Sequence, residues 1–192
     1  MKRVIGHEVG AWGHFCTNTL APLNANIHPQ RMHTLLKNWK PGQVFDEAPL
    51  FYETMDKESG DLMHATTDEV QAIAKAMRAH GMDVNPPTIF DYEAESFIEP
   101  GITRVNEIFS RSPGYKGFRA PFKKRDDGKF EPDFTHRYFT EDVPYSLVVW
   151  KGIALLFSVP TPTIDFLIEW AQKLMGKVLL YSYVYMLCVY ED

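Results

Sequence analysis

Two short segments of this sequence carry side chains whose types and spacing could do chemistry. The first segment, N-A-N-I-H-P at residues 24–29, places the Asn24 amide four residues before the His28 imidazole. Residues four apart share one face of a helix, so both side chains could reach a common ligand. An imidazole exchanges protons near neutral pH. The structural alternative is a histidine that caps a helix end or is partly buried with its hydrogen bonds satisfied.

The second segment is H-R-Y-F-T-E-D-V-P at residues 136–144, between a long loop and an apolar stretch. It places the Arg137 guanidinium five residues before the Asp142 carboxylate, and Asp142 stands where a helix is expected to begin. The structural alternatives are a solvated loop charge for Arg137 and a helix N-cap for Asp142. Composition and spacing alone leave the chemical and the structural interpretations open.

Apolar periodicity predicts that helices position these segments. Pro22 should interrupt the first helix, which ends near His28, because a residue before proline avoids the helical conformation. Thr66-Thr67-Asp68-Glu69 has the pattern of a capping box that opens a later helix. Helices are therefore expected over residues 10–28, 29–39, 66–81, 93–109 and 162–175, and the fourth of these is broken at Pro100-Gly101. A further helix should begin between Asp142 and Tyr145 and end at 157. A long loop is expected over 110–136.

The composition excludes several classes of protein. The chain has 192 residues, of which 45% are hydrophobic, as expected for one globular domain. A net charge of −5 without a basic run argues against nucleic-acid binding. Cys16 and Cys188 are too few for a disulfide framework, which favours a reducing cytoplasm. The apolar stretch Val178–Tyr190 is shorter than the roughly 20 residues that a membrane span needs.

Cofactor and metal motifs are missing from the sequence. Gly6, Gly10 and Gly13 do not have the G-x-G-x-x-G spacing of a dinucleotide-binding turn and do not follow an apolar strand. No H-E-x-x-H or C-x-x-C is present, so no metal site is predicted.

Several segments resemble a known family in their amino-acid sequences and in their order along the chain. N-x-x-x-H-P at residues 24–29 and R-Y-F-T-E-D-V-P-Y-S-L at 137–147 resemble the helical domain of the octopine/nopaline (opine) dehydrogenases. The segments at 66–77 and 152–165 support the resemblance, which spans roughly residues 10–176. R-Y-x-T-E-D-V-P is its most specific element. The resemblance implies a mainly α fold like the C-terminal substrate domain of 6-phosphogluconate-dehydrogenase-type enzymes, over residues 1–176, followed by an apolar tail of unknown role at 177–192.

The resemblance also implies a reaction and roles for four residues. Members of the family use NADH or NADPH to condense the amine of an amino acid reductively with a 2-keto acid. By resemblance, His28 transfers a proton, Asp142 orients it, Arg137 binds a substrate carboxylate and Asn24 hydrogen-bonds the substrate. The NAD or NADP would be held mainly by a Rossmann domain, which this sequence does not show. The domain is therefore expected to be catalytic only when joined to a Rossmann domain in the same or another chain, and a Rossmann-domain partner chain or a homo-oligomer is a candidate partner.

Two other functions are compatible with the sequence. One is a stand-alone helical fragment that binds a small carboxylate or mediates oligomerisation without turnover. The other is the helical domain of a hydroxyacid, ketopantoate or glycerol-phosphate dehydrogenase, against which R-Y-x-T-E-D-V-P argues. The opine-dehydrogenase hypothesis makes a geometric prediction. His28 and Asp142 should meet across a shared cleft that Arg137 and Asn24 also face.

Overall fold

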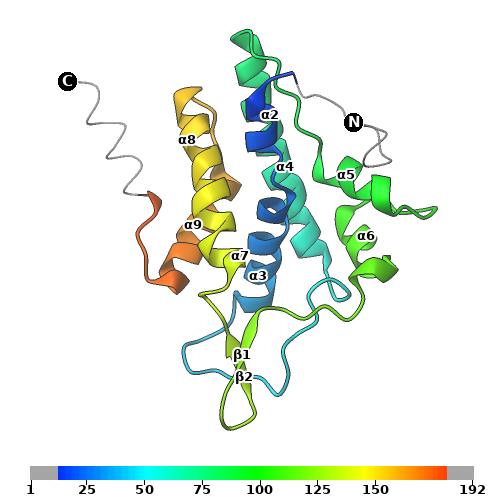
Figure 1. Ribbon diagram of the computed structural model, residues 1–192, viewed down its shortest axis with the longest axis vertical. Coiled ribbons are helices and arrows are strands. Elements are labelled where there is room, and N and C mark those ends of the chain that lie inside the picture. Colours follow the sequence, from blue (N-terminus) through cyan, green and yellow to red (C-terminus); the bar gives the residue numbers. More distant parts are fainter. Residues whose placement is uncertain (1–12, 181–192) are drawn as a thin grey trace, which may run out of the picture.

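Helices dominate the part of the chain that the computed structural model describes, residues 13–180. The strands β1 (Phe122–Lys124) and β2 (Phe130–Pro132) form a small antiparallel hairpin that projects from one end of the helices (Figure 1). The α-helices are α2 (Phe15–Leu20), α3 (His28–Leu36), α4 (Lys57–Ala79), α5 (Ile89–Ser96), α6 (Val105–Arg111), α7 (Arg137–Thr140), α8 (Val148–Leu156) and α9 (Pro162–Met175). Two 3-10 helices, η1 (Leu23–Asn26) and η2 (Pro113–Tyr115), and one π-helical turn, η3 (Val143–Leu147), complete the helical elements. The predicted mainly α fold is confirmed.

The long helix α4 forms the centre of this arrangement. It packs against α3, α6 and α9, and α3, α4, α8 and α9 run roughly along one axis (Figure 1). The α4 side chains of Met63, Ile73 and Ala74 are fully buried in the core. Gly60 allows α6 to approach α4 closely, because a Cβ atom there would clash with the side-chain amide of Asn106.

The predicted start of α4 at the Thr66–Glu69 capping box is wrong. The helix begins nine residues earlier, at Lys57, where the Asp56 carboxylate accepts a hydrogen bond of 2.8 Å from the Ser59 backbone N–H. Thr66 lies buried in the middle of α4. Glu69 does cap a helix, but a different one. Its two carboxylate oxygens accept from the backbone N–H groups of Thr163 and Ile164 at 2.6 and 2.9 Å, at the start of α9.

Other predicted helix ends agree better with the structure. Gly81 follows the end of α4 with φ +82°, and Gly176 closes α9 with φ +62°, both in the left-handed region that glycine tolerates. Pro162 occupies the first position of α9, as expected for a residue without an N–H to leave unpaired. The 110–136 segment is mostly irregular apart from η2 and the hairpin.

Within residues 13–180, no helix is both long and apolar enough to cross a membrane. Most of the predicted apolar tail, Val178–Tyr190, and Cys188 lie outside the described residues, as do Gly6 and Gly10. At the described end of the chain, the backbone N–H groups of Leu179 and Leu180 donate to the side-chain carbonyl of Gln172 on α9.

Candidate active site

His28 stands at the first position of α3, where the chain turns out of η1. Pro29 follows within the first helical turn, where a missing N–H does no harm. The His28 side chain is only 2% exposed. The expectation that Asn24 and His28 share one helix face is wrong, because Asn24 belongs to the 3-10 helix η1 and Ile27 separates it from α3. A 3-10 helix has about three residues per turn, so the four-residue rule does not apply.

Asp142 meets His28 as the geometric prediction requires. The distance from the His28 Nδ1 to the Asp142 Oδ2 is 2.7 Å, across 114 residues of sequence. Asp142 has helical backbone angles and makes no side-chain capping bond, so the N-cap alternative is wrong. The π-helical turn η3 begins directly after it. Such wide turns occur frequently at functional sites.

The contact with Asp142 determines which nitrogen of His28 is available for chemistry. A carboxylate accepts hydrogen bonds, so the Nδ1 carries the hydrogen and the Nε2 is left with its lone pair. The hydroxyl of Tyr52 lies 3.4 Å from this Nε2, as a long hydrogen bond in which the hydroxyl donates. Tyr52 therefore occupies the position in which a substrate atom could exchange a proton with His28.

Aromatic rings enclose the imidazole. The Tyr138 ring stacks on the His28 ring with a centroid distance of 3.5 Å, and the Phe51 ring lies 5.7 Å away. Phe51 and Tyr52 belong to a segment without regular structure, which the buried Arg31 of α3 holds in place. The Arg31 Nε donates to the Phe51 carbonyl at 2.7 Å.

The electrostatics of the site follow from its burial. Burial lowers the pKa of His28, and the hydrogen bond and negative charge of Asp142 only partly oppose this effect. The positive charge of Arg137 lowers the same pKa further. Burial also raises the pKa of the Tyr52 hydroxyl far above its ordinary value. Near neutral pH the site thus holds a neutral imidazole and a protonated phenol, a pair that can exchange a proton with a bound substrate.

Arg137 and Asn24 are both exposed. The Arg137 guanidinium lies 6.0 Å from the centroid of the Tyr138 ring, and this ring stacks on the His28 imidazole. Among the described residues, no carboxylate lies within ion-pair distance of Arg137. The structure thus brings His28, Asp142 and Arg137 together. It gives no contact between Asn24 and any of the three.

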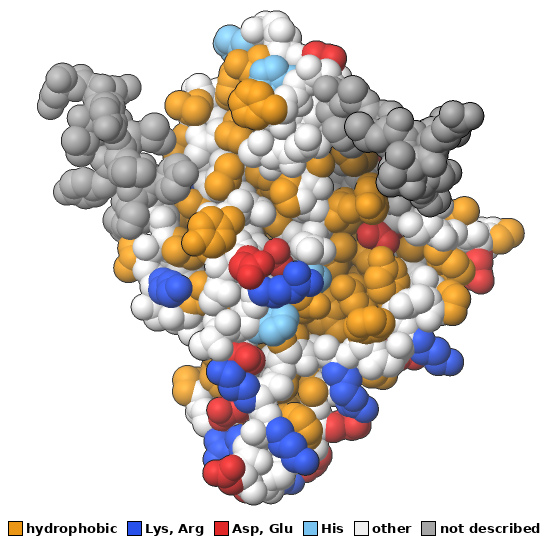
Figure 2. All heavy atoms as spheres, in the orientation of Figure 1, with side chains coloured by type: hydrophobic (Ala, Val, Ile, Leu, Met, Phe, Trp, Pro, Cys, Tyr) orange, Lys and Arg blue, Asp and Glu red, His pale blue; other side chains and the backbone are white. Residues whose placement is uncertain are grey.

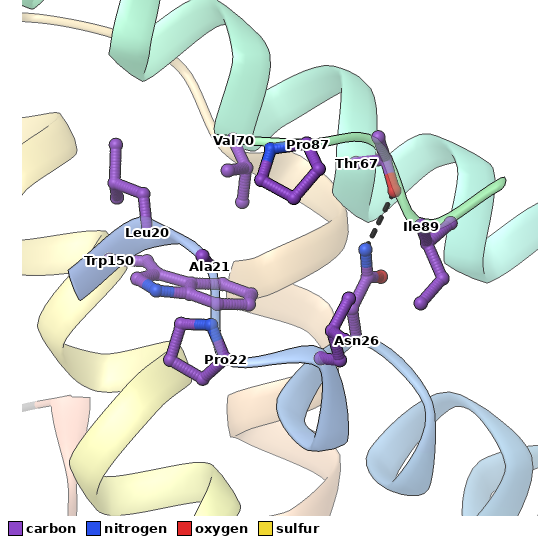
Figure 3. Close-up of a pocket in the computed structure, with 10 residues that line it drawn as sticks. Leu20, Ala21, Pro22, Asn26, Thr67, Val70, Pro87, Ile89 and Trp150 are labelled. Atoms are coloured by element: carbon purple, nitrogen blue, oxygen red, sulfur yellow. Dashed lines mark hydrogen bonds between the residues drawn. The ribbon is translucent and has the colours of Figure 1, made fainter. Parts of the chain in front are cut away.

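Figure 2 shows this region from one side of the molecule, with histidine, basic and acidic side chains gathered at the centre of the face beside a continuous apolar surface. A separate cavity lies between η1, α4 and α8, where Trp150 and Pro22 line it (Figure 3). Asn26 donates to the Thr67 hydroxyl there at 2.6 Å. With a volume of about 10 Å³, this cavity holds at most one water molecule and no substrate. Residues 13–180 contain no cluster of His, Cys, Asp or Glu able to hold a metal ion.

Comparison with known proteins defines the class to which this fold and site belong. Residues 12–175 match the family model described as NAD/NADP octopine/nopaline dehydrogenase, alpha-helical domain. The chain belongs to this family of dehydrogenases, and the matched residues are its helical domain. The predicted resemblance is confirmed.

Individual relatives are named as tauropine or octopine dehydrogenases. Tauropine dehydrogenase of Arabella iricolor is 37% identical over 171 residues, which is 86% of this chain and 43% of that protein. Octopine dehydrogenase of Mizuhopecten yessoensis is 36% identical over 160 residues, or 80% of this chain and 39% of that protein. A solved structure of octopine dehydrogenase with NADH and L-arginine is similar with a TM-score of 0.76 and 31% identity, covering 85% of this chain and 41% of that one. The chain thus spans less than half the length of these relatives.

Three residues of the site were not predicted from the sequence. Tyr138 could have been found, because it stands four residues before Asp142, a spacing that brings side chains to one side of a helical segment. Tyr52 and Arg31 gave no local signal. They reach the site through the fold of an irregular segment, which periodicity does not describe.

Proposed function

We propose that residues 1–176 form the substrate-binding and catalytic helical domain of an opine-type dehydrogenase, with residues 177–192 as a separate apolar tail. The reaction is the reductive condensation of the amine of an amino acid with a 2-keto acid, or the reverse oxidation. The observation that carries the proposal is the 2.7 Å contact between His28 and Asp142, beside the Arg137 guanidinium, which forms no ion pair with a carboxylate of residues 13–180.

Each of the three side chains has a role that its geometry supports. Asp142 fixes the ring of His28 and stabilises the imidazolium that forms when the Nε2 takes up a proton. The Nε2, which carries a lone pair at rest, takes a proton from the amine as it adds to the keto-acid carbonyl, and then gives this proton to the hydroxyl that leaves as water when the imine forms; in the reverse direction the proton follows the same path backwards. Arg137 binds a substrate carboxylate, for which the guanidinium fork is suited. Asn24 remains a proposed substrate-binding residue because it is exposed near the start of α3.

The described residues do not fit a nicotinamide nucleotide. Their only sheet is the hairpin of β1 and β2, without the parallel strands and glycine-rich turn that hold a dinucleotide. NAD or NADP, which supplies the reducing equivalent, would be bound mainly by a Rossmann domain outside this region, in the same chain or in a partner. The cytoplasmic location and an oligomeric assembly stay predictions.

Turnover measurements test the proposal in an enzyme that pairs this chain with a nucleotide-binding domain, by following NADH oxidation with amino acid and keto acid. Loss of general acid–base catalysis predicts that His28→Ala lowers kcat by about 100-fold or more. Asp142→Asn should lower kcat because it disfavours the useful tautomer. Arg137→Ala should chiefly raise KM. The matched control is His80→Ala, which removes an exposed histidine from the end of α4.

Two outcomes would contradict the proposal. Near-normal turnover of His28→Ala would remove the proton-transfer role. An assembled enzyme that binds a small carboxylate without oxidising NADH would favour the non-catalytic alternative, a fragment for carboxylate binding or oligomerisation.

A further inference from the structure

The hydroxyl of Tyr52 is a buried hydrogen-bond donor to which the proposed reaction gives no role. Tyr52 is 9% exposed, and its hydroxyl lies 3.4 Å from the His28 Nε2. Hydrogen bonds donated by hydroxyl groups are usually about 2.7–2.8 Å long, so this contact is weak. Polar groups buried in proteins are as a rule well hydrogen-bonded. We therefore expect the Tyr52 hydroxyl to gain a better acceptor when a substrate is present.

Aromatic packing fixes the position of this hydroxyl. The Tyr52 ring stacks on the Tyr115 ring at a centroid distance of 4.5 Å, and it meets the Phe51 ring at an interplanar angle of 84°. The Tyr115 hydroxyl donates to the Glu93 carboxyl group at 2.8 Å, which holds the Tyr115 ring in turn. The Tyr52 hydroxyl is thus in place before a substrate arrives, and electrostatic stabilisation of a reaction requires such preorganised donors.

The distance between the Tyr52 hydroxyl and the His28 Nε2 allows one substrate atom to contact both. An oxygen atom can lie about 2.8 Å from each of them, because the two are only 3.4 Å apart. In the proposed reaction the Nε2 gives a proton to the oxygen of the former keto group, so this oxygen must approach the Nε2. The same oxygen then lies beside the Tyr52 hydroxyl.

The charge on this oxygen changes during the reaction. Negative charge develops on it as the amine adds to the carbonyl, and a fixed hydrogen-bond donor stabilises such charge. Burial raises the pKa of Tyr52 far above its ordinary value, and the neighbouring Tyr138 and Tyr115 raise it further. The hydroxyl therefore keeps its own proton. It is suited to donate a hydrogen bond, while His28 transfers the proton.

We propose that Tyr52 is a further catalytic residue, whose hydroxyl donates a hydrogen bond to the carbonyl oxygen of the 2-keto acid. The proposal rests on the proposed function, because it assumes that a keto acid reacts beside His28. The hydroxyl polarises the carbonyl for attack by the amine and then stabilises the negative charge on the oxygen. Asp142 acts through the imidazole, whereas Tyr52 acts on the substrate itself.

Turnover of Tyr52→Phe tests this role in the enzyme that pairs this chain with a nucleotide-binding domain. The variant keeps the ring and its stacking and removes only the hydroxyl. Loss of one such donor predicts that kcat with pyruvate falls by about 100-fold. The inhibition constant of propanoate should not change, because propanoate has the carboxylate of pyruvate without its carbonyl. Tyr92→Phe, at an exposed position of α5, is the matched control and should keep the kcat of the unaltered enzyme.

A second measurement separates a direct role from one through His28. In NMR spectra of the 192-residue chain, the signal of the His28 Nδ1–H should remain in Tyr52→Phe, because its bond to Asp142 is retained. Loss of this signal would mean that Tyr52 acts by holding His28, and would overturn the proposal. An unchanged kcat, a propanoate inhibition constant that rises as turnover falls, or a variant that does not fold would also overturn it.

Failure of this proposal is distinguishable from failure of the proposed function. An unchanged kcat of Tyr52→Phe beside an inactive His28→Ala would overturn the role of Tyr52 alone. Near-normal turnover of His28→Ala, or an assembled enzyme that does not oxidise NADH, would overturn both.

Discussion

Replacing Arg31 with methionine should destabilise the protein strongly, because this buried guanidinium holds the segment that covers His28. Arg31 is 2% exposed, and its Nη2 donates to the Leu50 carbonyl at 3.2 Å in addition to the Nε bond with Phe51. Asp56 is 3.9 Å away and half exposed, so it compensates the charge weakly. Burial accordingly lowers the pKa of Arg31.

The magnitude follows from the groups that lose their partners. Two backbone carbonyls left without donors cost about 1–3 kcal/mol each. Part of this cost is offset, because methionine has no charge to desolvate on folding. We therefore expect Arg31→Met to lower the free energy of unfolding by about 2–3 kcal/mol. Urea unfolding followed by far-ultraviolet circular dichroism measures this difference.

Arg125→Met on the hairpin is the matched control. Arg125 is 43% exposed and pairs with Asp127 and Glu131 at the surface, where ion pairs contribute about 0–1 kcal/mol. If the free energy of unfolding of Arg31→Met were within about 0.5 kcal/mol of that of the unaltered chain, its effect would be no larger than that of the control. The Arg31 guanidinium would then not hold the segment in place, and the reasoning would be wrong.

Three further predictions concern the cap of α9, pH and the cofactor. Glu69→Ala removes the acceptor for two N–H groups at the start of α9 and should cost about 1–3 kcal/mol in urea unfolding; an unchanged midpoint would contradict the capping role. Burial lowers the pKa of His28 and His33, so the folded state binds fewer protons than the unfolded state. The contribution of these two histidines to the free energy of unfolding is therefore fully present above about pH 6.5, and it is lost as the pH falls below that value. A stability that is flat or rises between about pH 7 and pH 5 would refute this sign. The chain alone should bind NADH more weakly than micromolar in calorimetry, and tighter binding would indicate a nucleotide site in it.

Local signals in the sequence predicted the C-terminal end of α4 and both ends of α9, because those ends depend on a few neighbouring residues. Gly81, Pro162 and Gly176 act through their own backbone conformations, and the structure places each where it was expected. The contact between His28 and Asp142 was also predicted, although not from spacing. It followed from the resemblance to the opine dehydrogenases, which implies that Asp142 orients His28.

Features that depend on distant parts of the chain were not predicted. The Thr66–Glu69 motif has the letters of a capping box, but Glu69 caps a helix 94 residues further on. Residues 57–65 lack a clear apolar period, and Gly60 lowers helix propensity, so the first turns of α4 are stabilised by tertiary packing that local propensity does not describe. Tyr52 was also missed, because it lies in an irregular segment that tertiary packing positions. No local pattern places its hydroxyl beside His28.

The bond between Glu69 and the first turn of α9 also bears on the order in which the chain folds. Thr163 and Ile164 find their acceptor on α4 and not within their own segment. The first turn of α9 therefore cannot be capped until a loop of more than 90 residues has closed. The chain loses the entropy of this loop before the hydrogen bonds to Glu69 can form. The amide hydrogens of Thr163 and Ile164 consequently report on the assembly of α4 with α9, and their protection from exchange with solvent should reflect the free energy of separating the two helices.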